Sequence, residues 1–137
     1  MSGGGIASDD QGSMWFAPDN GYVSQLNEVP FSGRQPPTSL EAAVHATVAS
    51  GGSLNVVDFF MPFEKVQLDG ADKGLGTSPL EILPSQYSCG DVCRIGVVTG
   101  KSGKTYWFNL DNLGGYQNGP NKGGAAFRVY QTRTWST

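Results

Sequence analysis

The spacing of apolar residues in the first third of the chain is that of an α-helix. Three apolar residues recur at intervals of four, the period of one helix face: Leu40, Val44 and Val48. Thr38 and Glu41 have the spacing of a capping box, and Gly51-Gly52 provides a left-handed cap at the other end. The pattern therefore predicts a helix at about residues 38–50.

After this helix the pattern becomes that of β-strands. β-Branched and aromatic residues, partly in alternation with polar ones, predict about five strands: 54–60, 63–68, the two halves of a hairpin at 94–110, and 125–135. Gly-rich segments at 69–79 and 112–124 predict long loops. We therefore expect an α+β fold, in which one helix packs on a mainly antiparallel sheet of about five strands.

Two Gly-Lys-Ser/Thr triplets within residues 100–105 raise the question of a phosphate-binding loop. Such a loop needs a glycine five residues before the Gly-Lys pair, but Ile95 and Val98 stand at those positions. The loop must also lead into a helix, whereas residues 105–108 are a β-branched and aromatic run. The glycines therefore predict the turn of the hairpin, and no nucleotide cofactor is expected.

The length of 137 residues fits one domain. Three consecutive glycines and two aspartates predict a flexible N-terminal arm over residues 1–13, followed by a single domain at 14–137. No apolar run approaches a transmembrane helix, and the N-terminus lacks the basic and apolar parts of a signal peptide. We expect a soluble protein without membrane insertion, either cytoplasmic or exported by a signal-independent route.

The net charge of −3 is unevenly distributed along the chain. Residues 1–93 carry eleven acidic residues against three basic ones, a net charge of −8; residues 94–137 carry six basic residues against one acidic residue, a net charge of +5. The basic part could face an anionic partner, or the two parts could pack together and cancel their fields. We favour internal compensation, because position in the sequence does not fix position on the surface.

Few residues suggest chemistry. His45 is the only histidine, and the predicted helix places it one turn after Glu41, where the pair could orient a general base or be an ordinary surface pair. Cys89 and Cys93 are predicted to lie within disulfide reach, although a Cys–His nucleophilic pair stays open. A zinc site needs about four ligands, so neither a metal nor another cofactor is expected. Asp58 interrupts an apolar strand, which indicates a paired, outward-facing or functional carboxylate.

The last third of the chain interleaves aromatic and basic residues, a mixture that can stack on bases and neutralise the phosphates of single-stranded nucleic acid. Four residues are candidates for nucleic-acid or anion binding: Lys101, Lys104, Trp107 and Arg133. Four others could form a metal-independent ribonuclease site: His45 as the base, with Arg128, Tyr130 and Thr132 on the last strand. The pI of about 4.9 is low for a dedicated nucleic-acid binder.

Two functional hypotheses follow. The first is a non-enzymatic, β-rich interaction or assembly module, of the kind found in shells, appendages or virions, which engages a protein partner through its loops and N-terminal arm. The alternative is a small metal-independent ribonuclease or RNA-binding effector or toxin domain, with RNA as the partner. One helix followed by an antiparallel sheet is used by ribonuclease toxins and by many binding domains, so the expected fold does not choose between them.

Overall fold

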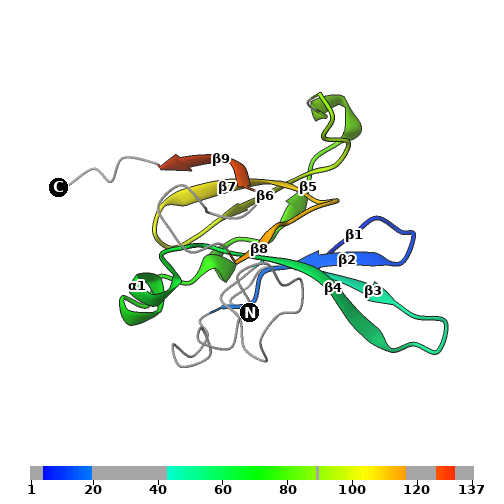
Figure 1. The fold of residues 1–137 in the computed structure, drawn as a ribbon, viewed down its shortest axis with the longest axis horizontal. Helices are drawn as coiled ribbons and strands as arrows, with labels where there is room; N and C mark the ends of the chain where they lie inside the picture. Colours follow the sequence, from blue (N-terminus) through cyan, green and yellow to red (C-terminus); the bar gives the residue numbers. More distant parts are fainter. Residues whose placement is uncertain (1–4, 20–42, 89, 117–125, 132–137) are drawn as a thin grey trace.

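Nine strands in two sheets form the framework of the part of the chain that the computed structural model describes, which is residues 5–19, 43–88, 90–116 and 126–131 (Figure 1). The first sheet has the order β1-β2-β3-β4-β8, with β1 (Ala7–Ser8), β2 (Ser13–Phe16), β3 (Ala43–Val48), β4 (Leu54–Met61) and β8 (Gly115–Tyr116). The second has the order β5-β6-β7-β9, with β5 (Glu81–Ile82), β6 (Ile95–Thr99), β7 (Lys104–Asn109) and β9 (Ala126–Gln131). Only the β4–β8 pair is parallel among these strands.

Helical structure in the described residues is limited to one short α-helix and two 3₁₀ turns. These are α1 (Lys65–Gly70), η2 (Leu75–Thr77) and η3 (Ser85–Tyr87). None of the helices in these residues is long and apolar enough to cross a membrane. The protein is therefore predominantly β and mainly antiparallel, with little helix, and the expected helix packed on one five-stranded sheet is not its architecture.

The predicted helix at 38–50 is wrong over its described part, because residues 43–48 form strand β3; residues 38–42 lie outside the described residues. β3 pairs with β2 on one side and β4 on the other, and it buries three of its six residues. An isolated helix of this length is marginal in water, so two strand ladders and this burial outweigh the local helical spacing. Gly51-Gly52 serves in the turn to β4, and the φ of Gly52 is 79°.

The strand predicted at 63–68 is also wrong, since this segment leads into α1. The N–H of Leu68 donates to the carbonyl of Glu64 at 3.0 Å, as in the first turn of a helix. Lys65 and Leu68, three residues apart, are buried on one helix face, while Val66 between them is exposed. A short alternation of apolar and polar residues fits either element, and here the helical burial pattern prevails.

The hairpin predicted at 94–110 is confirmed as β6 and β7. Its turn is closed by the N–H of Gly100, which donates to the carbonyl of Lys104 at 2.9 Å, and by the N–H of Gly103, which donates to Gly100 at 3.0 Å. Gly103 has a φ of 77°, which glycine adopts without steric cost. The strands predicted at 54–60 and 125–135 correspond to β4 and β9, and residues 125 and 132–135 of the second lie outside the described residues.

The N-terminal part of the described chain joins the first sheet. Ala7–Ser8, within the segment expected to be a flexible arm, forms β1 and pairs antiparallel with β2. The register places Ala7 opposite Trp15 and Ser8 opposite Met14. The sheet therefore begins within the first ten residues of the chain.

The main hydrophobic core contains residues from both sheets: Trp15, Ala17, Ala43, Phe60, Leu75, Leu80, Val98, Tyr106, Phe108, Leu110 and Leu113. Phe60 of β4 lies at its centre, with ring centroids 5.4 Å from Tyr106 and 4.8 Å from Phe108 of β7. Phe59 packs instead in a second cluster with Val44 and Met61, because successive side chains of a strand point to opposite faces. β4 is thus buried on both faces at this end.

Gly76 allows η2 to approach the chain after β2. A Cβ at this position would lie 2.6 Å from the backbone oxygen of Ala17. We expect Gly76→Ala to lower the free energy of unfolding by about 1–3 kcal/mol, because the backbone must shift to make room. Gly51→Ala is the control, since nothing lies within 4 Å of a Cβ there, and it should change stability by less than about 0.5 kcal/mol. Denaturant unfolding measures both, and equal stabilities would contradict the close approach.

Candidate functional site

His45, the candidate general base, lies on β3 with its ring stacked on Trp15 of β2. The two residues are paired directly across the strands, with ring centroids 4.4 Å apart and ring planes at 15°. The imidazole Nε2 is buried and has no hydrogen-bond partner among the described residues. A general base needs a nitrogen within hydrogen-bond reach of the substrate proton. Catalysis through Nε2 would therefore require this stack to open.

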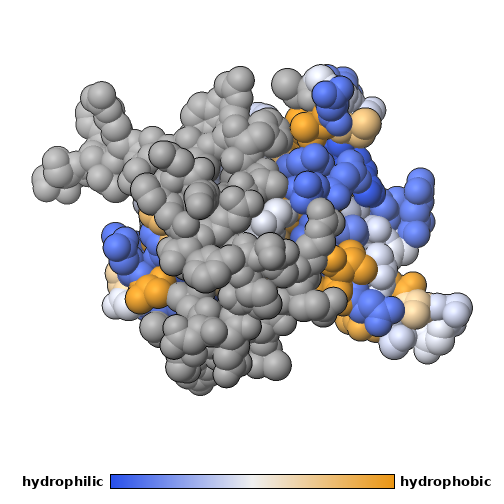
Figure 2. Space-filling view, viewed as in Figure 1, coloured by the Kyte–Doolittle hydropathy of each residue, from blue (hydrophilic) through white to orange (hydrophobic). Residues whose placement is uncertain are grey.

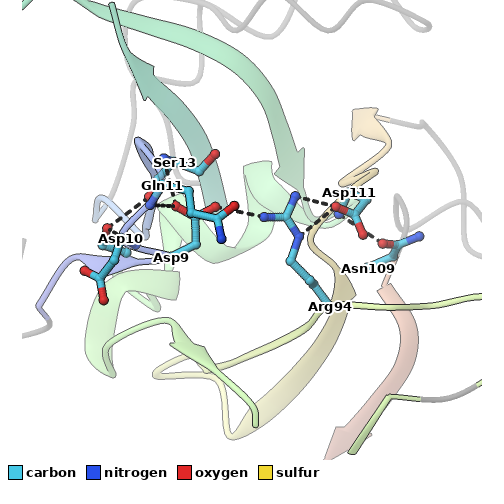
Figure 3. A network of polar contacts seen from close by, with 8 residues as sticks. Asp9, Asp10, Gln11, Ser13, Arg94, Asn109 and Asp111 are labelled. Atoms are coloured by element: carbon cyan, nitrogen blue, oxygen red, sulfur yellow. Dashed lines mark hydrogen bonds and ion pairs between the residues drawn. The ribbon is translucent and has the colours of Figure 1, made fainter. Parts of the chain in front are cut away.

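Arg94 lies over the same indole. Its guanidinium also contacts carboxylates from segments of both sheets, Asp9 and Asp111 (Figure 3). Its guanidinium carbon is 5.1 Å from the Trp15 ring centroid. One nitrogen donates to Asp9 at 3.0 Å, while Nε donates to Asp111 at 2.8 Å and a second nitrogen also donates to Asp111. Arg94 precedes β6, Asp111 follows β7, and Asp9 belongs to the β1–β2 turn. The Arg94 side chain therefore connects the β1–β2 turn of the first sheet to the open end of the β6–β7 hairpin.

The Asp9 carboxylate is positioned by its own turn. Its Oδ1 accepts the N–H groups of Gln11 at 2.9 Å and Ser13 at 3.0 Å, while Oδ2 faces Arg94. Burial raises the pKa of Asp9, but these two N–H groups and the positive charge of Arg94 outweigh burial and hold the pKa below its usual value. The turn therefore presents a charged carboxylate to Arg94.

The same arrangement keeps His45 neutral. Burial lowers the pKa of His45, and the positive charge of Arg94 lowers it further. The carboxylates of Asp58, Asp9 and Asp111 act in the opposite direction without reversing the shift. The Trp15 indole thus contacts two groups, the cationic guanidinium of Arg94 and the neutral imidazole of His45. This arrangement suits packing better than proton transfer.

Asp58, the charge that interrupts an apolar strand, is 3% exposed and lies opposite His45 in the β3–β4 ladder. Its two carboxylate oxygens accept the backbone N–H groups of Phe59 at 2.9 Å and Leu113 at 2.7 Å. The second bond joins β4 to the segment after β7. Of the interpretations that the sequence left open, an outward-facing carboxylate is wrong, because Asp58 is buried and accepts two backbone hydrogen bonds.

The residues proposed for RNA cleavage are distributed over both sheets. His45 is on β3 of the first sheet, while Arg128 and Tyr130 belong to β9, the last strand of the second sheet. The β7–β9 register places the backbone of Arg128 opposite Trp107 and that of Tyr130 opposite Thr105. The side chains of β9, and Thr132 and Arg133 as a whole, lie outside the described residues.

The lysines proposed to bind anions are paired with carboxylates around α1. Lys101 contacts Asp72 at 2.7 Å, and Lys104 contacts Glu64. Both lysines lie at the β6–β7 turn, so the basic hairpin faces acidic residues of the preceding segment. Lys65 of α1 is buried and paired with Asp69. These contacts agree with internal compensation of the uneven charge.

Cys93 is exposed, and its predicted disulfide partner Cys89 lies outside the described residues, so the disulfide stays a prediction. Within the described ranges, no group of three or more His, Cys, Asp or Glu side chains could hold a metal ion.

A second feature is the free end of the β3–β4 hairpin, which projects from the molecule at the right of Figure 1. We call residues 47–57 the hairpin tip; it contains no charged residue, and none of its residues is buried. Val48 and Leu54 are paired across the strands and are 46% and 61% exposed, and Val57 is 38% exposed. In Figure 2 the end of this hairpin is coloured mostly white to orange. An apolar strand pair is thus presented to solvent.

Sequence reasoning identified His45 but missed the residues around it. No motif in the sequence marks Trp15, Arg94 or Asp111 as its neighbours. Arg94 and Asp9 are 85 positions apart in the sequence. No local pattern connects residues at such a separation, so only the fold could reveal this cluster. The hairpin tip was missed because its first strand lies within the predicted helix at 38–50.

Comparisons with known proteins give no relative for this chain: no family model matches it, and neither the curated proteins nor the solved structures include a significant match.

The lowered pKa of His45 predicts a pH dependence of stability. Below the unfolded pKa of about 6.5, the unfolded chain binds a proton that the folded protein resists. The free energy of unfolding should therefore fall as the pH decreases from about 6.5 toward the folded pKa of His45. His45→Phe keeps a ring on Trp15 and removes the only histidine, so its stability should be flatter over this window. Urea unfolding between pH 5 and 8 measures this difference, and identical pH slopes would contradict it.

Arg94 should contribute more to stability than an ordinary surface lysine. We expect Arg94→Met to lower the free energy of unfolding by about 1–2 kcal/mol, a value reduced by partial exposure of the ion pairs. Lys101→Met is the control, because its pair with Asp72 is 53% and 75% exposed, and it should cost no more than about 0.5 kcal/mol. Chemical denaturation at low and moderate salt compares the variants, and equal losses would refute the assignment.

Proposed function

We propose that this protein is a non-enzymatic binding and assembly module, and that the hairpin tip is its contact surface for a protein partner. One observation carries the proposal. Half of the eight-residue strand β4 leaves the core and extends into solvent with exposed Leu54 and Val57 and no charged side chain.

Exposed strands at a sheet edge are normally protected against pairing with other chains. Lysine, inward-pointing charges, proline or a bulge usually provide this protection. Residues 54–57 are Leu-Asn-Val-Val and contain no charge or proline, and the one irregularity is a register shift against β3 at Val57. β4 has β3 on one side and β8 on the other, and β8 pairs with it only at Phe60 and Met61. Among the described strands, the β8-side edge of residues 54–57 therefore has no ladder partner. Such a strand is suited to pairing with a partner.

The chemistry of the tip defines the class of partner. Three exposed aliphatic side chains, those of Val48, Leu54 and Val57, supply apolar area. β4 supplies a backbone edge, whereas β3 is already paired with β2 at Thr47. β-Strand addition combines main-chain hydrogen bonds with pockets for alternate side chains. The partner surface is therefore expected to be an apolar protein surface, a strand edge or both. A phosphate backbone would find no cation on this tip.

The alternative function, RNA cleavage or RNA binding, receives less support from the described residues. Lys101 and Lys104 are engaged by carboxylates, and His45 offers a buried Nε2. The contact surface proposed here differs from the one expected from the sequence. Because β1 is part of the first sheet, the hairpin tip replaces the N-terminal arm as the proposed contact surface.

A photo-reactive amino acid at Leu54 tests the proposal. In the cells that produce the protein, we expect one reproducible adduct, identified by mass spectrometry, that disappears when Val48→Asp is added. The matched control places the same group at Val66 on α1, which is 46% exposed, as is Val48. This position should give no such adduct. Equal labelling from both positions, or none from Leu54, would remove the tip as a binding surface.

A further inference from the structure

The hydrogen bonds of the hairpin tip show which backbone groups of β4 face away from β3. The tip is closed by the N–H of Ala49, which donates to the carbonyl of Ser53 at 2.9 Å. Hydrogen-bonded and non-hydrogen-bonded pairs alternate in an antiparallel ladder, so the next pair, Val48 and Leu54, is a non-hydrogen-bonded one. Accordingly, the N–H of Val48 donates to Gly12 of the β1–β2 turn at 3.0 Å. The N–H and C=O of Leu54 therefore face the opposite edge of the hairpin.

The same alternation applies to Val56. It lies two residues after Leu54, opposite Ala46 and on the tip side of the register shift, so its N–H and C=O also face away from β3. We call the β8-side edge of residues 54–57 the free edge, because no strand of the described part of the sheet pairs with it. Two N–H and two C=O groups, from Leu54 and Val56, are thus directed along this edge.

Asp58 marks the inner end of the free edge. Its carboxylate accepts the N–H of Phe59 at 2.9 Å and the N–H of Leu113, just ahead of β8, at 2.7 Å. β8 then pairs with the next part of β4 in parallel. The edge of β4 therefore already carries one strand, and its open part continues in line with that strand for about 13 Å, at 3.3 Å per residue.

The free edge defines the chemistry of an occupant. A row of N–H and C=O groups is matched by another extended backbone, which offers donors and acceptors at the same spacing. The side chains of an added strand would lie beside Leu54 and Val56 on one face and beside Asn55 and Val57 on the other. None of these four residues is charged, so a charged side chain on the added strand would lose water without gaining an ion pair. The edge therefore fits an extended, uncharged segment with apolar residues at alternate positions.

We propose that a strand of this kind, contributed by a partner protein, adds to the free edge and pairs with the backbone of Leu54 and Val56. This inference rests on the proposed function and narrows its partner from an apolar surface to an extended strand. A helix or a flat apolar surface would cover the tip and leave the outward N–H and C=O groups buried without partners, which is costly. Strand addition buries the side chains and satisfies these backbone groups together.

A photo-reactive amino acid at Val57, which is 38% exposed beside the free edge, identifies the occupant. After irradiation of the cells that produce the protein, mass spectrometry of the digested adduct gives the sequence of the cross-linked peptide. We expect a run of about four uncharged residues with apolar residues at alternate positions, the length that pairs with residues 54–57. A contact segment that contains Lys, Arg, Asp or Glu within this run, or an adduct to a second copy of this chain, would overturn the inference.

Two substitutions at one position test the backbone pairing. Leu54→Pro removes an N–H that faces away from β3, and proline is tolerated at the first residue of a strand, so the hairpin should be retained. Leu54→Ala is the matched control, because it shortens the side chain and keeps the N–H. We expect Leu54→Pro to lower the yield of the Val57 adduct about fivefold or more beyond Leu54→Ala, the effect of one lost hydrogen bond. Circular dichroism verifies folding, and the peptide sequence from the wild-type chain decides the case if the proline variant does not fold.

The outcomes also separate this inference from the proposed function. A specific adduct that Leu54→Ala and Leu54→Pro reduce equally would overturn the strand pairing and keep the hairpin tip as a binding surface. The absence of any specific adduct from both Leu54 and Val57 would overturn both.

Discussion

The packing of Phe60 between the two sheets is the contact on which the rest of the structure depends. It joins β4 to the aromatic residues of β7 and fixes the buried half of that strand. The other half, residues 54–57, continues into solvent from this anchored end. Because a paired strand is stiff and rises about 3.3 Å per residue, the core holds the hairpin tip in place from a distance. Burial at one end of β4 therefore positions the surface at the other.

Arg94 adds a second constraint where the sheets meet. Its guanidinium is shared between Asp9 and Asp111 and lies over Trp15, whose ring also stacks on His45. A second positive charge on His45 would act against the field of Arg94, which agrees with the lowered pKa of that imidazole. The only histidine is thus best understood as part of the packing between strands.

The distribution of charge separates two kinds of surface. The lysines of the β6–β7 turn are engaged by carboxylates next to α1, whereas residues 47–57 carry no charge at all. Nucleic-acid binding depends on cations that are free to replace counterions. Protein association depends on apolar area and on strand edges that can be paired. The described residues supply the second set, and our proposal of a protein partner rests on them.

The sequence alone determined those elements whose cause is local. Glycines at 100 and 103 between two β-branched and aromatic runs are sufficient for a hairpin, and the dense apolar run at 54–60 is sufficient for a strand. Residues 43–48 were different, because their spacing fits a helix and they become a strand only when two neighbouring strands pair with them. The Arg94–Asp9 contact likewise joins segments that are far apart in the chain. Tertiary structure decided these features, because the residues that stabilise them lie far away in the sequence and no local pattern includes them.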